Sequence, residues 1–350
     1  MKPIHIIGAT IISCIAFSCN GKSDGNENKI QFEQTKALYA SDSINLEQYE
    51  IYNPEHIIAS DDSLWITVGE GVLERVYLLD GSGKYKAKGI SVGQGPNEVL
   101  EITSIHRTPY YITIYDARKG VLSELRYKKG AMQLIPLASQ LRLFDDACML
   151  PDSNLLIVPV LKNYSYALLD KHGHIADSLD YYPPKPDKSS RFTHSLACTG
   201  EMAIAPSQER FARTTVYDGA IDFFSINDDS LTHLLRQEEF GVDYDIINAV
   251  QPVPTLSKTT RCGYKSLTVS NDLFYALFSD TLALENESKE CKEVQTFTLD
   301  GVPCHKYLLD RKITDIAVKP DNSVLYGIGK TNNHEEAVVL YIYKLNETTP

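Results

Sequence analysis

A turn followed by a short apolar strand recurs along the chain, and this repeat constrains the fold more than any other feature of the sequence. The turns are built from Asp, Asn, Ser, Thr, Pro or Gly. The strands that follow them contain six equivalent positions: Leu64, Tyr111, Leu155, Met202, Leu273 and Val324. The steps between these positions are 47, 44, 47, 71 and 51 residues. A period of about 40–50 residues is typical of β-propeller blades, whereas a two-sheet sandwich, the alternative fold, needs no constant spacing.

Each repeat unit has the same internal plan of four strands. One strand precedes the turn, and the predicted first strands are His56–Ala59, Ile102–His106, Asp146–Leu150, Ser195–Thr199, Ser266–Ser270 and Ile313–Val318. A third strand often ends at a tight turn such as Asp300-Gly301, where glycine adopts a positive φ at low cost. Central strands such as Leu155–Val158 are continuously apolar, as expected when both faces of a sheet are covered. The sequence therefore predicts an all-β, six-bladed propeller with four-stranded blades over residues 46–350.

The last repeat unit predicts how the ring closes. It ends near Leu345, with too little chain left for a fourth strand. A blade without its outer strand would leave an open sheet edge. We therefore predict that a strand within residues 30–51 completes the sixth blade.

The amino terminus has the features of an export signal. Lys2 precedes the apolar run Ile4–Phe17, which is shorter than the roughly 20 residues of a membrane-spanning helix. The run ends just before Cys19, and a polar stretch follows. A cysteine in this position resembles the lipobox of bacterial lipoproteins, although Phe17 stands where that pattern prefers a small residue. An ordinary secretory signal with an incidental cysteine is the alternative.

These features divide the chain before the propeller. Residues 1–18 are predicted to form a lipoprotein signal peptide, with Cys19 as the lipidated residue. Residues 19–45 are predicted to contain a polar tether and the closing strand. The expected location is the cell envelope, where the lipid anchors the protein to a bacterial membrane, the outer membrane being favoured.

Charge and cysteine content exclude some classes of function. The chain has 34 Lys and Arg against 46 Asp and Glu, a net charge of −12, so a nucleic-acid partner is not expected. Five cysteines remain after Cys14 and Cys19, an odd number that disulfides cannot use completely. Cys291 and Cys304 flank a predicted hairpin but are poorly placed for bonding, so buried free thiols are expected.

One hexapeptide points to a family. Gly93-Gln94-Gly95-Pro96-Asn97-Glu98 lies between the first and second repeat units. Together with the lipobox and the blade pattern, it resembles the TolB-like six-bladed propeller lipoproteins, over residues from about 45 to the end. This resemblance implies the fold and the envelope location but no catalytic residue, because such proteins are mostly of unassigned function. Glu98 either stabilises a tight corner or contacts a ligand.

Long loops supply the candidate ligand-binding residues. Residues 181–194 and 240–264 form two insertions, and residues 207–214 are expected to form a loop on the same face. Arginine and aromatic side chains in these segments have the composition of a binding surface: Tyr182, Arg191, Arg210, Phe211, Arg213 and Arg261. The favoured function is a non-enzymatic platform for a protein or glycan ligand, without a cofactor. Ordinary loop packing is the alternative reading of these side chains.

An enzyme is the second hypothesis. Acidic or histidine side chains near the starts of first strands are expected to approach the channel mouth: Glu98, Glu101, Asp145, Asp146, His194 and Asp315. Oxygen ligands from different blades suit Ca²⁺, which would serve a hydrolase, lactonase or lyase. No sequence motif of a hydrolase or metalloprotease occurs, and solvated loop acids are the simpler interpretation.

Overall fold

The computed structural model describes residues 30–141, 144–151, 153–160, 162–182, 190–227, 230–247, 253–285, 290–331 and 337–345. The predicted signal peptide and Cys19 lie outside these residues. Within the described ranges no helix is long and apolar enough to cross a membrane.

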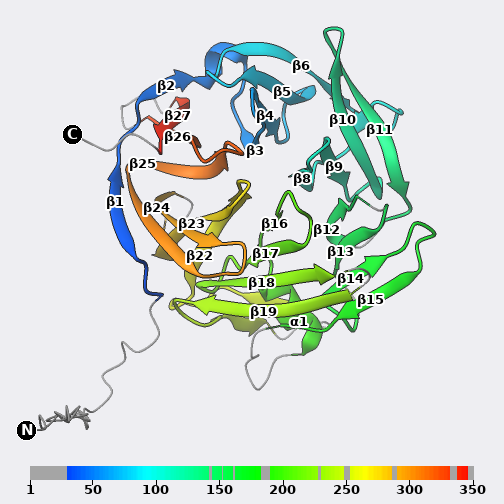
Figure 1. Ribbon diagram of the computed structural model, residues 1–350, viewed down its shortest axis with the longest axis vertical. Helices are drawn as coiled ribbons and strands as arrows, with labels where there is room; N and C mark the ends of the chain where they lie inside the picture. Colours follow the sequence, from blue (N-terminus) through cyan, green and yellow to red (C-terminus); the bar gives the residue numbers. More distant parts are fainter. Residues whose placement is uncertain are drawn as a thin grey trace, which may run out of the picture.

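Four consecutive segments of the described chain each form a sheet of antiparallel strands around a common centre (Figure 1). Blade 1 contains β3 (Pro54–Ala59), β4 (Ser63–Val68), β5 (Glu74–Asp80) and β6 (Tyr85–Val92), with β7 (Glu98–Val99) parallel at its edge. Blade 2 contains β8 (Ser104–Arg107), β9 (Ile112–Asp116), β10 (Val121–Lys128) and β11 (Ala131–Ser139). Blade 3 contains β12 (Phe144–Met149), β13 (Leu155–Pro159), β14 (Tyr166–Leu169) and β15 (Ile175–Leu179). Blade 4 contains β16 (Met202–Ile204), β17 (Arg210–Thr214), β18 (Ala220–Asn227) and β19 (Ser230–Glu238).

Blades 5 and 6 share one long strand, β25 (Pro303–Val318). Its first part pairs with β24 (Cys291–Thr298) and completes blade 5, which also contains β22 (Arg261–Val269) and β23 (Leu273–Leu282). Its second part, from Ile313, pairs with β26 (Val324–Lys330), which is followed by β27 (Val338–Lys344). The described strands therefore form six blades, as predicted.

The amino-terminal segment closes the ring, which confirms the predicted closing strand. Strand β2 (Asp42–Asn45) is antiparallel to β27, with Asp42 opposite Ile342. It supplies the fourth strand of blade 6. Before it, β1 (Gln34–Leu38) runs parallel to β25 along the outside of blade 5 (Figure 1), and a 3-10 helix, η1 (Leu46–Tyr49), leads into blade 1.

The core lies between the blades rather than within any one of them. Six apolar clusters among the described residues each combine side chains of two neighbouring blades. Between blades 3 and 4, for example, Leu156 and Tyr166 pack with Phe211 and Phe224. A single four-stranded sheet has two apolar faces that it cannot cover alone, so radial stacking is the arrangement that buries both.

One predicted first strand is wrong. Residues 195–199, expected to begin blade 4, fall largely in the helix α1 (Arg191–Ala197) and its C-terminal cap. The helix begins at Ser190, whose hydroxyl oxygen accepts a hydrogen bond from the Thr193 amide at 3.1 Å. The innermost strand of blade 4 is instead β16, and Met202 therefore lies in a first strand rather than in a second.

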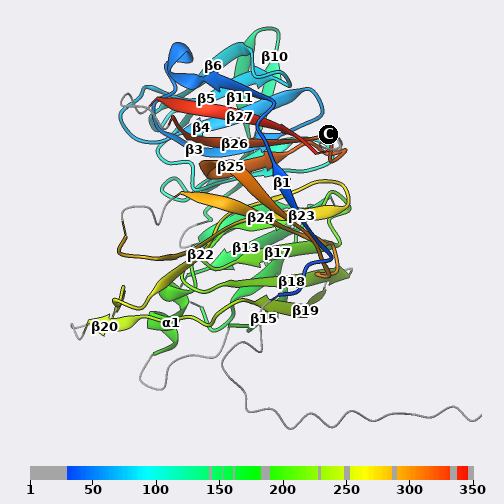
Figure 2. The ribbon, with the colours of Figure 1, turned by 90° about the vertical axis from the view of Figure 1, so that its left-hand side faces the viewer.

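The two insertions lie on the same side of the disc. The second insertion contains a small hairpin of β20 (Asp245–Ile247) and β21 (Val253–Thr255). Figure 2 shows α1 and β20 protruding together, and we call this side the helix face. The opposite side, which carries the turns between first and second strands, is called the turn face.

The cysteines of the described residues are free thiols. Cys148, Cys198, Cys262 and Cys291 are buried, and Cys304 is half-buried. Burial raises the pKa of Cys291 to about 12, so this thiol stays protonated at neutral pH. The expectation of free thiols is confirmed for these five positions.

Candidate functional site

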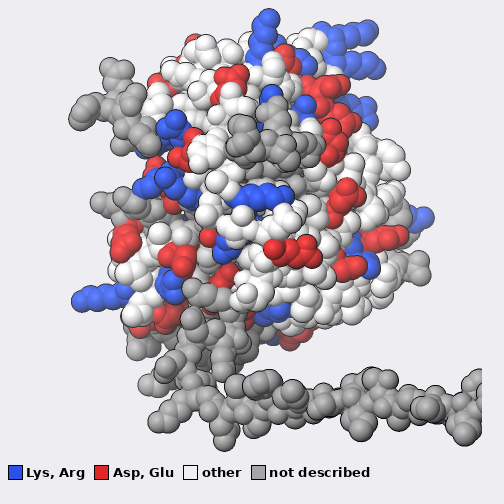
Figure 3. Space-filling model, turned by 60° about the vertical axis from the view of Figure 1, so that its left-hand side comes forward, with Lys and Arg blue, Asp and Glu red and all other residues white. Residues whose placement is uncertain are grey.

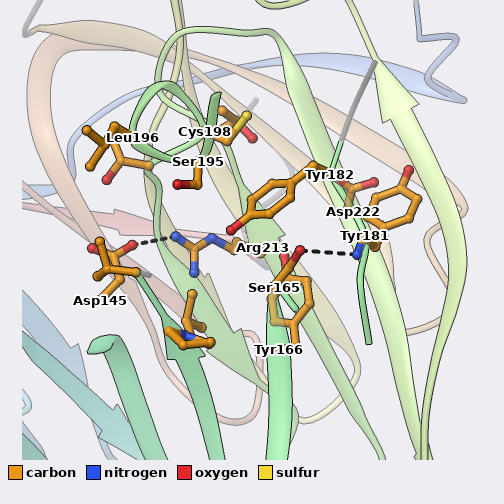
Figure 4. A pocket seen from close by; sticks show the side chains of 15 residues that line it. Asp145, Ser165, Tyr166, Tyr181, Tyr182, Ser195, Leu196, Cys198, Arg213 and Asp222 are labelled. Atoms are coloured by element: carbon orange, nitrogen blue, oxygen red, sulfur yellow. Dashed lines mark hydrogen bonds and ion pairs between the residues drawn. The ribbon is translucent and has the colours of Figure 1, made fainter. Parts of the chain in front are cut away.

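A cleft opens on the helix face between blades 3 and 4. Its volume is about 220 Å³, and its walls come from the ends of β12 to β15, from α1 and from β17 and β18 (Figure 4). Val158, Pro159 and Leu196 give it an apolar side, whereas Asp145, Ser165 and Arg213 among others give it a polar one. Small-molecule sites commonly combine an apolar lining with a few converging polar groups.

Arg213 is the central polar residue of this cleft. Along β17 the side chains alternate, so Arg213 lies on the same face as Phe211, which packs against blade 3. Only 7% of Arg213 is exposed, and its Nη2 donates a hydrogen bond to Asp145 Oδ2 at 2.5 Å. Its Nη1 is buried and has no hydrogen-bond partner among the described residues. A buried charged donor without a partner is costly, so an acceptor from water or a ligand is required here.

Tyr182, which follows β15, and Arg191, the first residue of α1, lie side by side at the cleft. The Tyr182 side chain lines the cleft near Arg213 (Figure 4), and the guanidinium carbon of Arg191 lies 5.2 Å from the centre of its ring. Arg191 also donates to both carboxylate oxygens of Asp180, at 2.8 and 2.6 Å. Burial raises the pKa of Tyr182, while a hydrogen bond with Ser165 and the charge of Arg213 act in the opposite direction. The ring is therefore held in place by a cation on one side and polar groups on the other.

An ion-pair network supports the far wall of the cleft. Asp222 lines the cleft and accepts a hydrogen bond from Arg236 Nη1 at 2.6 Å. The other nitrogens of Arg236 bind Asp218 at 2.7 Å and Glu238 at 2.8 Å. Burial raises the pKa of Asp218 to about 6, and the positive charge of Arg236 opposes this effect. The hydrogen bonds of this network hold the wall in place, although its one guanidinium group faces three carboxylates.

The thiol in the cleft is unsuited to nucleophilic catalysis. Cys198 lies one turn after His194 on α1, with its Sγ 3.6 Å from His194 Nε2. Burial raises the pKa of Cys198 well above its ordinary value, so the thiol remains protonated. His194 Nδ1 lies 3.1 Å from the Tyr244 hydroxyl, so the second insertion helps to position the helix.

A second cavity, of about 50 Å³, lies on the axis of the propeller. The inner strands line it with polar side chains that include His56, Ser104, His106, Glu201, Ser266 and Asp315. His106 Nε2 lies 2.7 Å from Asp146 Oδ1, and Asp315 pairs with the Ser266 hydroxyl and with the Ile57 amide at 2.8 Å. This space suits a water molecule or two but not an organic substrate.

Two carboxyl groups of this channel, those of Glu201 and Asp315, have raised pKa values. Burial, with the charges of Asp146 and Asp145, raises the pKa of Glu201 to about 7. Burial also raises the pKa of Asp315 to about 6. Among the described residues no group of three His, Cys, Asp or Glu side chains is placed to hold a metal ion.

The structure separates the residues that were expected to form one binding surface. Tyr182 and Arg213 line the cleft, and Arg191 contacts Tyr182. Arg261, in β22 of blade 5, lies outside the cleft. It pairs with Asp280, and its guanidinium carbon lies 4.6 Å from the centre of the Phe240 ring.

Residues 207–214 do not form the expected loop on the helix face. Ser207 to Glu209 belong to a turn on the opposite side, and residues 210–214 are β17. Arg210 therefore lies at the turn face, where its Nε donates to Asp300 at 2.9 Å. Phe211 is completely buried and stacks on Phe224 at 4.5 Å, so it belongs to the core rather than to a ligand surface.

Glu98 stabilises a backbone corner. Its carboxylate accepts a hydrogen bond from the Gly95 amide at 2.6 Å, and Lys119 Nζ donates to the Gly95 carbonyl at 2.8 Å. A Cβ at Gly93 would lie 2.1 Å from the Glu98 carboxylate, so a larger residue there would displace this carboxylate. The corner lies between blades 1 and 2, away from the cleft.

The acidic residues that were expected at the channel mouth also lie in different parts of the structure. Asp146 and Asp315 do reach the channel, Asp145 faces the cleft, and Glu101 binds the exposed Arg118 at 2.5 Å. Sequence reasoning missed His106 and Glu201. His106 ends the predicted first strand Ile102–His106, whereas the channel residues were sought near the starts of first strands.

Comparison with known proteins agrees with this architecture. A family model described as TolB-like 6-blade propeller-like matches residues 36–321. A solved member of the DUF4221 family from Bacteroides vulgatus superposes with a TM-score of 0.54 at 11% identity, covering 89% of this chain and 99% of that one. A putative exported protein from Bacteroides fragilis gives a TM-score of 0.47 at 10% identity, with coverages of 89% and 99%. No curated protein matches the chain.

The likeness to the Bacteroides vulgatus structure concerns the fold alone, given its low identity. The family match covers most of the propeller, from β1 into the last blade. The chain belongs to the TolB-like 6-blade propeller-like family.

Proposed function

We propose that this protein is a lipid-anchored protein of the cell envelope whose propeller binds a glycan, without catalysis, in the cleft between blades 3 and 4. Support for the location comes from the apolar run after Lys2 and from Cys19 with its polar tether. Support for binding comes from the cleft, and above all from one atom, the buried Nη1 of Arg213, which has no hydrogen-bond partner in the part of the chain that the structure describes.

The lining of the cleft suits a sugar ring. Tyr182 offers an aromatic ring with a polar tip, and Val158 and Pro159 add apolar surface for the C–H groups of a sugar. Ser165, Ser195 and Arg213 offer hydrogen bonds to hydroxyl groups. A volume of about 220 Å³ is below the roughly 300–1,000 Å³ of drug-sized pockets, so one sugar unit would enter while the rest of the glycan stayed outside.

A glycan microarray probed with the full-length protein in mild detergent tests the binding function. The expected result is binding to a defined set of glycans that Tyr182→Ala and Arg213→Gln both abolish. Arg210→Gln is the matched control, because Arg210 belongs to the same strand and also pairs with an aspartate, but at the turn face. Wild-type protein that bound no glycan, or a Tyr182→Ala variant that bound as well as wild type, would contradict the proposal. Far-ultraviolet circular dichroism of each variant confirms folding.

Membrane fractionation tests the anchor separately. Wild-type protein is expected in the outer-membrane fraction, and metabolic labelling with a fatty acid is expected to mark it. A Cys19→Ser variant should lose the label and leave the membrane fraction. Unlabelled wild-type protein in the soluble periplasmic fraction would refute the anchor and leave the glycan experiment unaffected.

A further inference from the structure

The charges around the cleft are unequal in sign. Two guanidinium groups, those of Arg213 and Arg236, face four carboxylates. The carboxylates are those of Asp145, Asp218, Asp222 and Glu238. His233 also lies 3.1 Å from Asp222 and offsets one of them only when it is protonated. Among the described residues, the surroundings of the cleft are therefore negative.

The polar groups that a ligand would meet form a donor beside an acceptor. Arg213 contributes the N–H groups of Nη1, to which no described residue offers an acceptor, while its Nη2 donates to Asp145. The Asp145 side chain is 38% exposed, so its carboxylate faces both Arg213 and the ligand space. A hydroxyl group both donates and accepts, so adjacent hydroxyls satisfy such a pair, whereas a carboxylate only accepts and is repelled by Asp145.

One side of the molecule has no dominant sign of charge. On the side shown in Figure 3, acidic and basic side chains are interspersed over the described residues, without a large basic area. The charges nearest to a ligand in the cleft are those of the residues around it. Those charges oppose an anionic ligand.

We infer that the cleft, if it is the glycan site proposed above, selects a neutral hexose with adjacent free hydroxyls and rejects the corresponding sugar acid. The Arg213–Asp145 pair performs the selection. Arg213 donates to one hydroxyl oxygen, and Asp145 accepts from the neighbouring hydroxyl. Tyr182 packs against the apolar side of the ring.

Saturation-transfer NMR with six sugars tests this inference on the full-length protein. The probes are glucose, galactose and mannose together with glucuronic, galacturonic and mannuronic acid. At least one neutral hexose is expected to bind, and its uronic acid is expected to bind about tenfold more weakly, because the added carboxylate is close to Asp145 and Asp222. The difference should shrink at high salt, while binding of the neutral sugar should change little.

A charge-neutral variant makes the test specific. Asp145→Asn keeps an oxygen acceptor for Arg213 but removes the negative charge. It should therefore reduce the difference in affinity between a hexose and its uronic acid. Asp300→Asn, which makes the same change in the Arg210 pair on the turn face, should leave this difference in affinity unchanged. Uronic acids that bind as tightly as neutral hexoses, or an Asp145→Asn variant with unaltered selectivity, would overturn the inference but leave the glycan-binding function standing. If none of the six sugars bound and the microarray were also negative, both would fail.

Discussion

Replacement of Glu201 by glutamine is expected to stabilise the protein above neutral pH. Glu201 precedes β16 and lines the central channel, where Asp146 and Asp145 add to the effect of burial. The positive charges of His106 and Arg213 act in the opposite direction but do not cancel it. The pKa of Glu201 is accordingly raised to about 7 from an ordinary value of 4.5.

The sign and size of the effect follow from this shift. A carboxyl group whose folded-state pKa is raised binds a proton more readily in the folded than in the unfolded protein, so its contribution to stability falls as pH rises from about 4.5 to about 7. One pKa unit corresponds to about 1.4 kcal/mol, so the ionised group costs up to about 3 kcal/mol at pH 8. Glutamine has nearly the shape of the neutral acid and does not ionise. Glu201→Gln should therefore match wild type near pH 4.5 and exceed it by up to about 3 kcal/mol at pH 8.

Thermal unfolding followed by circular dichroism between pH 4.5 and 8.5 measures this difference. At roughly 2–4 °C per kcal/mol, the variant should melt about 5–10 °C higher than wild type at pH 8. The stability of the variant should still depend partly on pH. The pKa of Asp315 is also raised, so ionisation of Asp315 also lowers stability as pH rises. Glu70→Gln, at a side chain that is 84% exposed, is the control and should change nothing. Parallel wild-type and Glu201→Gln melting profiles across this pH range would refute the reasoning.

Three further substitutions test the packing assignments. Phe211→Ala should destabilise the protein by about 3–5 kcal/mol in denaturant unfolding, since it empties a fully buried site between blades 3 and 4; a loss below 1 kcal/mol would argue against its place in the core. Gly301→Ala should cost more in melting temperature than Gly130→Ala. Both glycines have positive φ, but only at Gly301 would a Cβ lie 2.6 Å from the Phe223 ring, so equal losses would contradict that contact. Glu98→Ala should lower stability by about 1–2 kcal/mol and leave glycan binding on the microarray unchanged, whereas lost binding would make Glu98 a ligand contact.

The propeller was predictable because its determinants are local and repeated. Every blade must cover two apolar faces, and this requirement produces continuous apolar strands such as β13, in which all five residues are buried. The closing strand was predictable from the number of strands in the last repeat unit, because that unit ends before a fourth strand. It was confirmed by the pairing of β2 with β27.

Blade 4 was assigned incorrectly because a turn and an apolar strand occur there twice in succession. Thr199-Gly200 precedes β16, and the turn at Ser207 precedes β17. The spacing of the repeats does not show whether β16 or β17 is the second strand of the blade, because the insertion that contains α1 lengthens the connection before them. The long step of 71 residues has another cause, since the second insertion lies between blades 4 and 5. The incorrect assignment of blade 4 placed Glu201 in a turn between strands, so Glu201 was not predicted to lie in the channel.

The cleft was only partly predictable, for a reason that lies in the geometry of propeller strands. Arg210 and Arg213 are three residues apart in β17, which is about 10 Å along a strand, and this distance takes the chain from the turn face into the cleft. Near neighbours in sequence therefore lie on opposite sides of the disc, and the proposed group of arginines was divided. Residues at equivalent positions of different inner strands converge instead, as Ser266 and Asp315 do in the channel. In such a fold, sites are better sought by comparing equivalent positions of consecutive blades than by the composition of one loop.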